Sequence, residues 1–208
     1  MPGVPTLNRA ALASRARNIE YLTIAWNTAE GLTAVVAGLF ASSVSLLAFG
    51  IDSMIEVASA SALLWRIKVD ADVLNRERND KAALRVVGVC FIALAAYVTA
   101  ESVYELVERR ISDHSVAGIV VAGLALVVMP LLSRAKRRVA AALNSAAIVA
   151  DAKQADFCAY LSAILLAGLA LNAAFGFWWA DPVAALVMVP LIVKEGINGM
   201  RGECCQNC

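Results

Sequence analysis

Six long apolar runs, separated by short polar segments, occupy almost the whole chain. They lie at about residues 19–42, 44–66, 82–107, 115–134, 146–173 and 178–198. Apolar stretches longer than ~18 residues are typical of transmembrane helices, because about 20 helical residues cross the hydrocarbon core of a bilayer. With 61% hydrophobic and 17% charged residues, the composition argues against a soluble globular protein. The sequence therefore predicts an all-α integral membrane protein, a bundle of six transmembrane helices.

The runs divide the chain into an N-terminal arm at 1–18, one transmembrane domain at 19–198 and a short tail at 199–208. The arm lacks the short apolar core of a cleavable secretory signal. A net charge of +1, without a basic block interleaved with aromatic residues, gives no indication of a nucleic-acid partner. We expect a multi-pass protein of the plasma membrane whose main partner is the lipid bilayer.

The distribution of Lys and Arg orients the bundle. The connections after the second and fourth runs contain Arg66, Lys68, Arg76, Arg78, Lys81, Arg134, Lys136, Arg137 and Arg138. The connections on the other side contain only Arg109 and Arg110. Because short cytoplasmic loops have an excess of Lys and Arg, both termini are predicted to lie in the cytoplasm.

The second run contains two carboxylates, Asp52 and Glu56, at a spacing that places both on one helix face. An isolated charge at membrane depth costs from ~2.5 to more than ~10 kcal/mol, so the pair needs a partner, a cavity or an ion. Adjacent carboxylates repel each other unless a proton or a cation lies between them. The alternative is neutralisation by Lys or Arg from a neighbouring helix. No such residue lies inside the first, second, fourth or sixth run, and Lys153 lies near the start of the fifth.

The fifth run offers a second polar face, made of Asp151, Gln154 and Cys158. Carboxylate, amide and thiol groups together suit a divalent metal, and a thiolate favours zinc over harder ions such as manganese. We therefore predict a metal site of Asp52, Glu56 and Cys158. Either Gln154 or Asp151 would complete it.

Two further groups of residues are weaker candidates. Asn27 and Glu30 are polar at membrane depth in the first run, where they would line the ion path or hydrogen-bond to another helix. The tail contains Cys204, Cys205 and Cys208, which would capture a soft metal, accept palmitoyl chains or serve no function.

These motifs resemble the transmembrane domain of the cation diffusion facilitator (cation efflux) family, over about residues 19–198. The family has an A-D-x-x-H/D-x-x-x-D pattern in its second and fifth helices. The corresponding segments here are AFGIDSMIE, from Ala48 to Glu56, and ADAKQADFC, from Ala150 to Cys158. The resemblance implies six helices and a metal site between the second and fifth. It also implies proton-coupled efflux of a divalent cation by alternating access, with the metal as cargo and no prosthetic group.

The chain departs from the family pattern in three ways. Gln154 and Cys158 replace the usual His/Asp pair, and the family's C-terminal cytoplasmic domain and His-rich loop have no counterpart. Family members are usually dimers, so we expect a homodimer held by transmembrane contacts, for which the small-residue face GLTAVVAG is suitable.

The leading hypothesis is a zinc-preferring efflux transporter. The alternative is a metal-binding membrane sensor or modulator that does not transport. The choice among zinc, manganese, iron, cobalt and nickel stays open. An enzyme is not expected, because the chain has no HExxH signature and its one histidine, His114, lies outside the apolar core.

Overall fold

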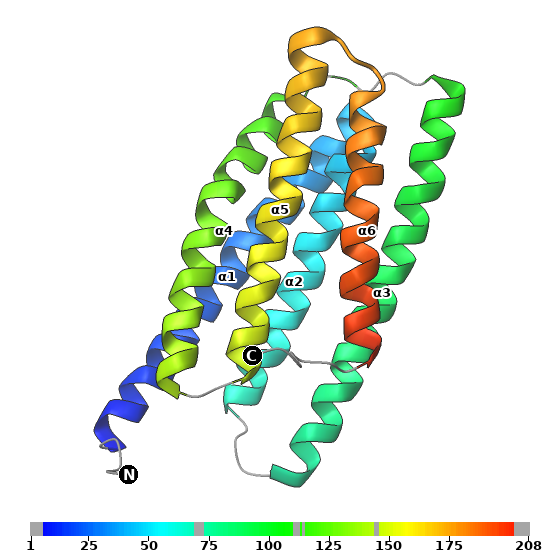
Figure 1. Cartoon of the computed structure of the whole chain (residues 1–208). Helices are drawn as coiled ribbons and strands as arrows, with labels where there is room; N and C mark the ends of the chain where they lie inside the picture. The colour runs from blue at the N-terminus through cyan, green and yellow to red at the C-terminus, as the bar shows by residue number, and fades with distance from the viewer. Residues whose placement is uncertain (1–5, 69–72, 110–112, 114, 144–145, 202–208) are drawn as a thin grey trace.

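The computed structural model describes residues 6–68, 73–109, 113, 115–143 and 146–201, and it confirms the six-helix bundle (Figure 1). The helices are α1 (Thr6–Ala41), α2 (Val44–Lys68), α3 (Val73–Glu108), α4 (Val116–Leu143), α5 (Ala146–Phe175) and α6 (Ala180–Arg201). Each is long and apolar enough to cross a membrane.

Three helices extend beyond the predicted apolar runs. α1 begins at Thr6, so the described part of the expected N-terminal arm is helical, and α3 begins at Val73 instead of 82. α4 continues past the predicted end at 134 to Leu143, through the segment RAKRRVAAAL. Ala, Lys, Arg and Leu are strong helix formers, so a helix need not end where its sequence becomes polar.

The helices pack as a group of four, formed by α1, α2, α4 and α5, and a pair, formed by α3 and α6 (Figure 1). α1 packs on α2 and α4, α4 packs on α5, and α3 packs mainly on α6. The α3–α6 contact is very close. A Cβ added to Gly88 would lie 2.7 Å from the Gly196 carbonyl oxygen. α2 and α5 contact each other, and both also contact α6. They therefore stand where the group of four meets the pair.

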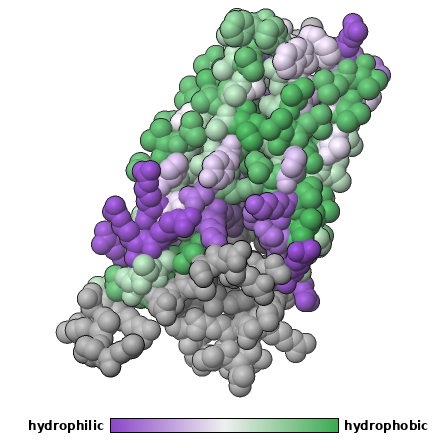
Figure 2. All heavy atoms as spheres, viewed as in Figure 1, coloured by the Kyte–Doolittle hydropathy of each residue, from purple (hydrophilic) through white to green (hydrophobic). Residues whose placement is uncertain are grey.

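The outer faces of the helices are apolar, as contact with lipid requires. Exposed side chains include Leu32, Val36 and Phe40 on α1, and Val127 and Leu131 on α4. Figure 2 shows hydrophobic residues over much of the described surface, with hydrophilic residues gathered toward one end.

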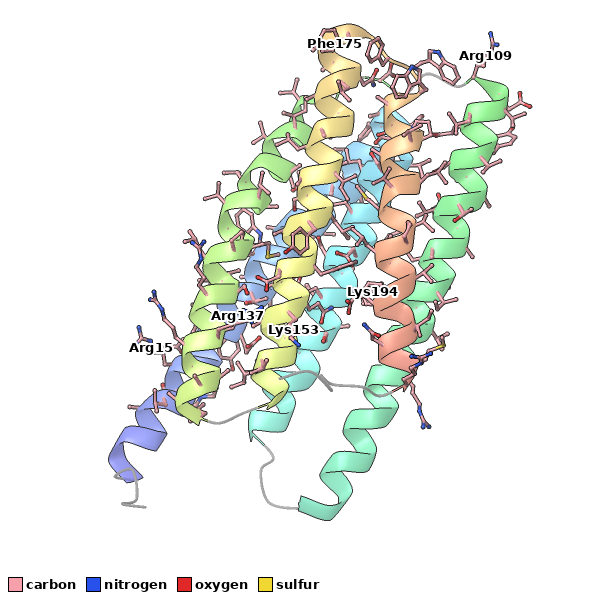
Figure 3. All side chains as sticks on the ribbon, viewed as in Figure 1. Arg15, Arg109, Arg137, Lys153, Phe175 and Lys194 are labelled. Atoms are coloured by element: carbon pink, nitrogen blue, oxygen red, sulfur yellow. The ribbon has the colours of Figure 1, made fainter. Side chains whose placement is uncertain are left out.

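We call that end, at which α1, α3 and α5 begin, the basic end. Its exposed cationic residues are Arg15, Arg17, Arg85, Arg134, Arg137, Arg138, Lys153, Lys194 and Arg201. Figure 3 shows four of them on that side of the bundle, and Arg109 and Phe175 at the opposite end. α1 begins and α6 ends at the basic end, which agrees with an even number of spans. The cytoplasmic placement of this end stays a prediction.

Candidate metal site

The predicted carboxylate pair lies in the interior of the bundle. Asp52 is 2% exposed and Glu56 is 1% exposed, on the face of α2 that packs against α1 and α5. Asp52 also interacts electrostatically with Glu30 of α1 and Glu195 of α6. Acidic groups of α1 and α6 therefore lie near this face of α2.

α5 brings a thiol to the same place. Cys158 is fully buried, and its side chain faces the Glu56 carboxylate. The carboxylates that act electrostatically on this thiol are Glu56, Glu30 and Asp52. Gln154, one turn earlier on α5, is half-buried. The structure thus brings Cys158 of α5 close to the carboxylate pair of α2.

α1 completes the polar interior. Asn27 is fully buried and Glu30 is 3% exposed, and the Asn27 side chain faces Glu56. The alternatives for these two residues were a place on the ion path or a hydrogen bond to another helix. In the structure they lie beside the carboxylate pair.

Many polar atoms of this cluster are buried without a partner. Among the described residues, no regular hydrogen bond is made by either carboxylate oxygen of Glu30 or Glu56, by the Asn27 amide, or by Nε2 of Gln154. Buried polar atoms are nearly always hydrogen-bonded, because leaving one unsatisfied costs about 1–3 kcal/mol. The arrangement therefore has donor atoms available for a polar ligand or ion.

The donors are not yet arranged as a coordination shell. No three His, Cys, Asp or Glu side chains in the described part of the chain are close enough together to hold a metal ion. An ion bound here would draw the carboxylates and the thiol closer together, or would use neutral donors such as the amides of Asn27 and Gln154.

Asp151 is engaged elsewhere. Its carboxylate forms an ion pair with Lys136 of α4, whose Nζ also lies 3.4 Å from Oε2 of Glu20 on α1. All three side chains are buried. Of the two residues proposed to complete the site, Asp151 is therefore already paired with a cation, whereas Gln154 is uncharged.

The prediction that Lys136 lies in a loop outside the apolar core is wrong. The residue was assigned to a loop because the predicted span ended at 134, whereas α4 continues and buries it. A signal was present in the sequence. Buried positions of α4 recur every three or four residues, at Gly118, Ala122, Ala125, Met129, Leu132, Lys136 and Val139. Lys136 lies on this stripe, and its neighbours Arg137 and Arg138 do not.

Lys136 also acts electrostatically on Glu56, so one basic residue does contribute to the charge balance near the pair. Glu195 was also missed. It is half-buried on α6, next to the buried stripe that includes Ile192 and Gly196. The tail cysteines Cys204, Cys205 and Cys208 lie outside the described residues.

Comparison with known proteins agrees with this architecture. The family model described as the cation efflux transmembrane domain matches residues 82–201, which is more than half of the chain. The matched segment contains Gln154 and Cys158 and does not reach the α2 carboxylates. An uncharacterized transporter of Methanocaldococcus jannaschii is 28% identical over 183 residues, which is 85% of this chain and 64% of the relative. The chain thus spans less than two thirds of that relative's length.

The match and the fold point in the same direction. Six helices long and apolar enough to span a membrane enclose buried acidic groups, and the matching family model describes a cation efflux transmembrane domain. This chain belongs to the cation efflux transmembrane-domain family.

Proposed function

We propose that this protein exports divalent metal cations, with zinc preferred, through a site formed by Asp52, Glu56 and Cys158. The observation that supports the proposal most directly is the set of buried polar atoms around Glu56 that make no regular hydrogen bond among the described residues. Two carboxylates and a thiol supply the negative charge that a divalent cation needs in a low-dielectric interior.

Gln154 is the α5 residue that completes the site in this proposal. It lies one helical turn from Cys158, and its amide oxygen is the atom that would ligate a metal. Asp151 is the weaker choice, because its ion pair with Lys136 already satisfies its charge. Asn27 and Glu30 flank the site from α1 and would receive the ion on its way in or out.

The thiol is the basis for proposing zinc. Thiolates favour zinc and softer ions, whereas a site of oxygen donors alone suits manganese or magnesium. Cys158 therefore sets the selectivity in this proposal, and the carboxylates supply most of the affinity.

Proton coupling follows from the ligand chemistry. A carboxyl group or thiol must lose its proton before it can ligate a metal, so binding releases protons and protonation helps to expel the ion. Proton return to Asp52 and Glu56 would then drive release on the far side. Alternating access is the corresponding structural cycle, with the site open to one membrane face at a time.

The test measures zinc uptake by liposomes into which the purified protein has been reconstituted. The liposomes enclose a zinc-sensitive dye, and a pH gradient is imposed across their membrane. The wild type is expected to take up zinc faster than empty liposomes, and Asp52→Asn is expected to lose this activity. Asp156→Asn is the matched control, because Asp156 is an acidic residue of α5 that pairs with Arg137 near the surface. Full activity of Asp52→Asn would refute the proposed site.

The same assay separates transport from the rival hypothesis of a metal-binding sensor. Zinc binding by the detergent-solubilised protein, together with no flux above that of empty liposomes, would favour the sensor. The observation that supports this alternative is the replacement of the usual His/Asp pair of α5 by Gln154 and Cys158.

A further inference from the structure

The ion-pair cluster of Glu20, Lys136 and Asp151 lies outside the proposed ligand set. It joins three helices, since Lys136 of α4 pairs with Glu20 of α1 and with Asp151 of α5. None of the three side chains is more than 5% exposed. Buried charges of this kind hold helices together strongly, because separating them leaves an uncompensated charge in the interior.

The cluster forms a layer between the basic end and the metal site. On α1, Glu20 lies two turns before Asn27, and on α5, Asp151 lies two turns before Cys158, a rise of about 10 Å. On the other side of the layer, toward the basic end, a small apolar cluster packs separately from the main core. It comprises Ala16, Val139, Ala140 and Ile148.

α4 and α5 are joined a second time at the same level. The Ser133 hydroxyl donates a 2.9 Å hydrogen bond to the backbone carbonyl of Ala152, next to Asp151. This bond fixes the register of the two helices, and the Lys136 ion pairs fix both of them to α1.

We propose that Lys136 is a positioning residue that closes the transport path at the basic end. While its ammonium group holds Glu20 and Asp151, α1, α4 and α5 stay in contact, and water from the basic end does not reach Cys158. Opening toward that end requires these ion pairs to separate. The inference concerns access to the site proposed above, and its test requires neither metal nor flux.

The experiment measures how fast Cys158 reacts with a water-soluble methanethiosulfonate reagent. The full chain is used in detergent micelles without metal, with its other four cysteines replaced by Ser, so that Cys158 is the single thiol. Lys136→Met is expected to speed the reaction on the order of tenfold, which corresponds to 1.4 kcal/mol. Lys136→Arg keeps the cation and is expected to react at the parent rate.

Two further variants distinguish opening of the path from a general loss of bundle stability. A triple variant combines Glu20→Gln, Lys136→Met and Asp151→Asn. It removes all three charges and leaves no unpaired charge in the interior, so it is expected to fold and to react faster at Cys158. Arg137→Met is the matched control. Arg137 joins α4 to α5 through its ion pair with Asp156, but its side chain is exposed.

A second reporter tests the direction of opening. With Cys158→Ser and Ser162→Cys, the single thiol lies one turn further from the basic end, at a position that is also fully buried. Loss of the ion pairs is expected to speed the reaction at 158 more than at 162. Equal acceleration at both positions, a parent rate in the triple variant, or equal acceleration by Arg137→Met would each overturn the proposal.

Discussion

The Asp181 carboxylate, at the start of α6, accepts a 2.6 Å hydrogen bond from the Ser43 hydroxyl, immediately before α2. The Ser45 hydroxyl and its backbone N–H, at 3.4 Å, donate to the same carboxylate. The first N–H groups of a helix have no partner within the helix and favour a negative charge nearby. Asp181 therefore caps α2 from another helix, at the end of the bundle opposite the basic end.

Asp181→Ala is expected to lower the stability of the bundle by about 2–4 kcal/mol, because Ser43 and Ser45 would keep their buried donors and lose the acceptor. Thermal unfolding in detergent measures the effect. Asp181→Asn keeps one acceptor oxygen and should lose less. Asp113→Ala changes an exposed carboxylate and should melt like the wild type. An unchanged melting temperature for Asp181→Ala would contradict this role.

Cys158→Ser is expected to reduce zinc affinity by on the order of tenfold or more, and to affect manganese binding much less. The reason is that a hydroxyl replaces the soft thiol donor that faces Glu56. Titration calorimetry with each metal measures both effects. Cys90→Ser removes an exposed thiol of α3 and serves as the control. A parallel loss of affinity for both metals would show that the thiol does not determine selectivity.

Glu56→Gln is expected to reduce the number of protons released when zinc binds. Its amide has no proton to give up on coordination, whereas a protonated Glu56 carboxyl would. Proton release is measured as the acidification of a weakly buffered solution on adding zinc. In the wild type, lower pH should weaken zinc binding because protons compete for the same ligands. Proton release equal to that of the wild type would exclude Glu56 as a titrating ligand.

Gly88→Ala is expected to destabilise the contact between α3 and α6 by about 1–3 kcal/mol, the usual cost of overpacking. The new Cβ would lie 2.5 Å from the backbone nitrogen of Met200. Gly123→Ala on α4 is the matched control, because a Cβ there meets nothing within 4 Å. Gly123→Ala should be neutral or slightly stabilising, since Ala is the better helix former. Equal melting temperatures for the two variants would refute the close approach.

Hydropathy and spacing were sufficient to predict the six helices and the common face of Asp52 and Glu56. Hydropathy locates the apolar part of a helix, and the 3.6-residue period places side chains around it. Hydropathy did not locate the C-terminal end of α4, because that helix continues through a basic segment. The error removed Lys136 from the predicted interior and left Asp151 without its ion-pair partner.

The meeting of Glu30, Glu56 and Cys158 was harder to predict. These residues lie on three helices, and the rotation of a membrane helix about its axis is set by packing against its neighbours. The sequence of one helix does not contain that information. For α1, however, Ala16, Glu20, Asn27 and Ala34 repeat with a helical period, and all of them are buried. Such a stripe of polar and small residues would have identified the inward face.

The contact between Gly88 and Gly196 restricts how the bundle can change shape. Backbone atoms of α3 and α6 approach each other closely there, and the Ile92 side chain packs beside Gly196, so we expect the two helices to move together. Movement between this pair and the other helices would then occur at the contacts with α2 and α5, the helices that provide Asp52 and Cys158. In the transport cycle proposed above, a tolerated substitution at this crossing is expected to slow turnover and to leave the equilibrium affinity for the ion intact.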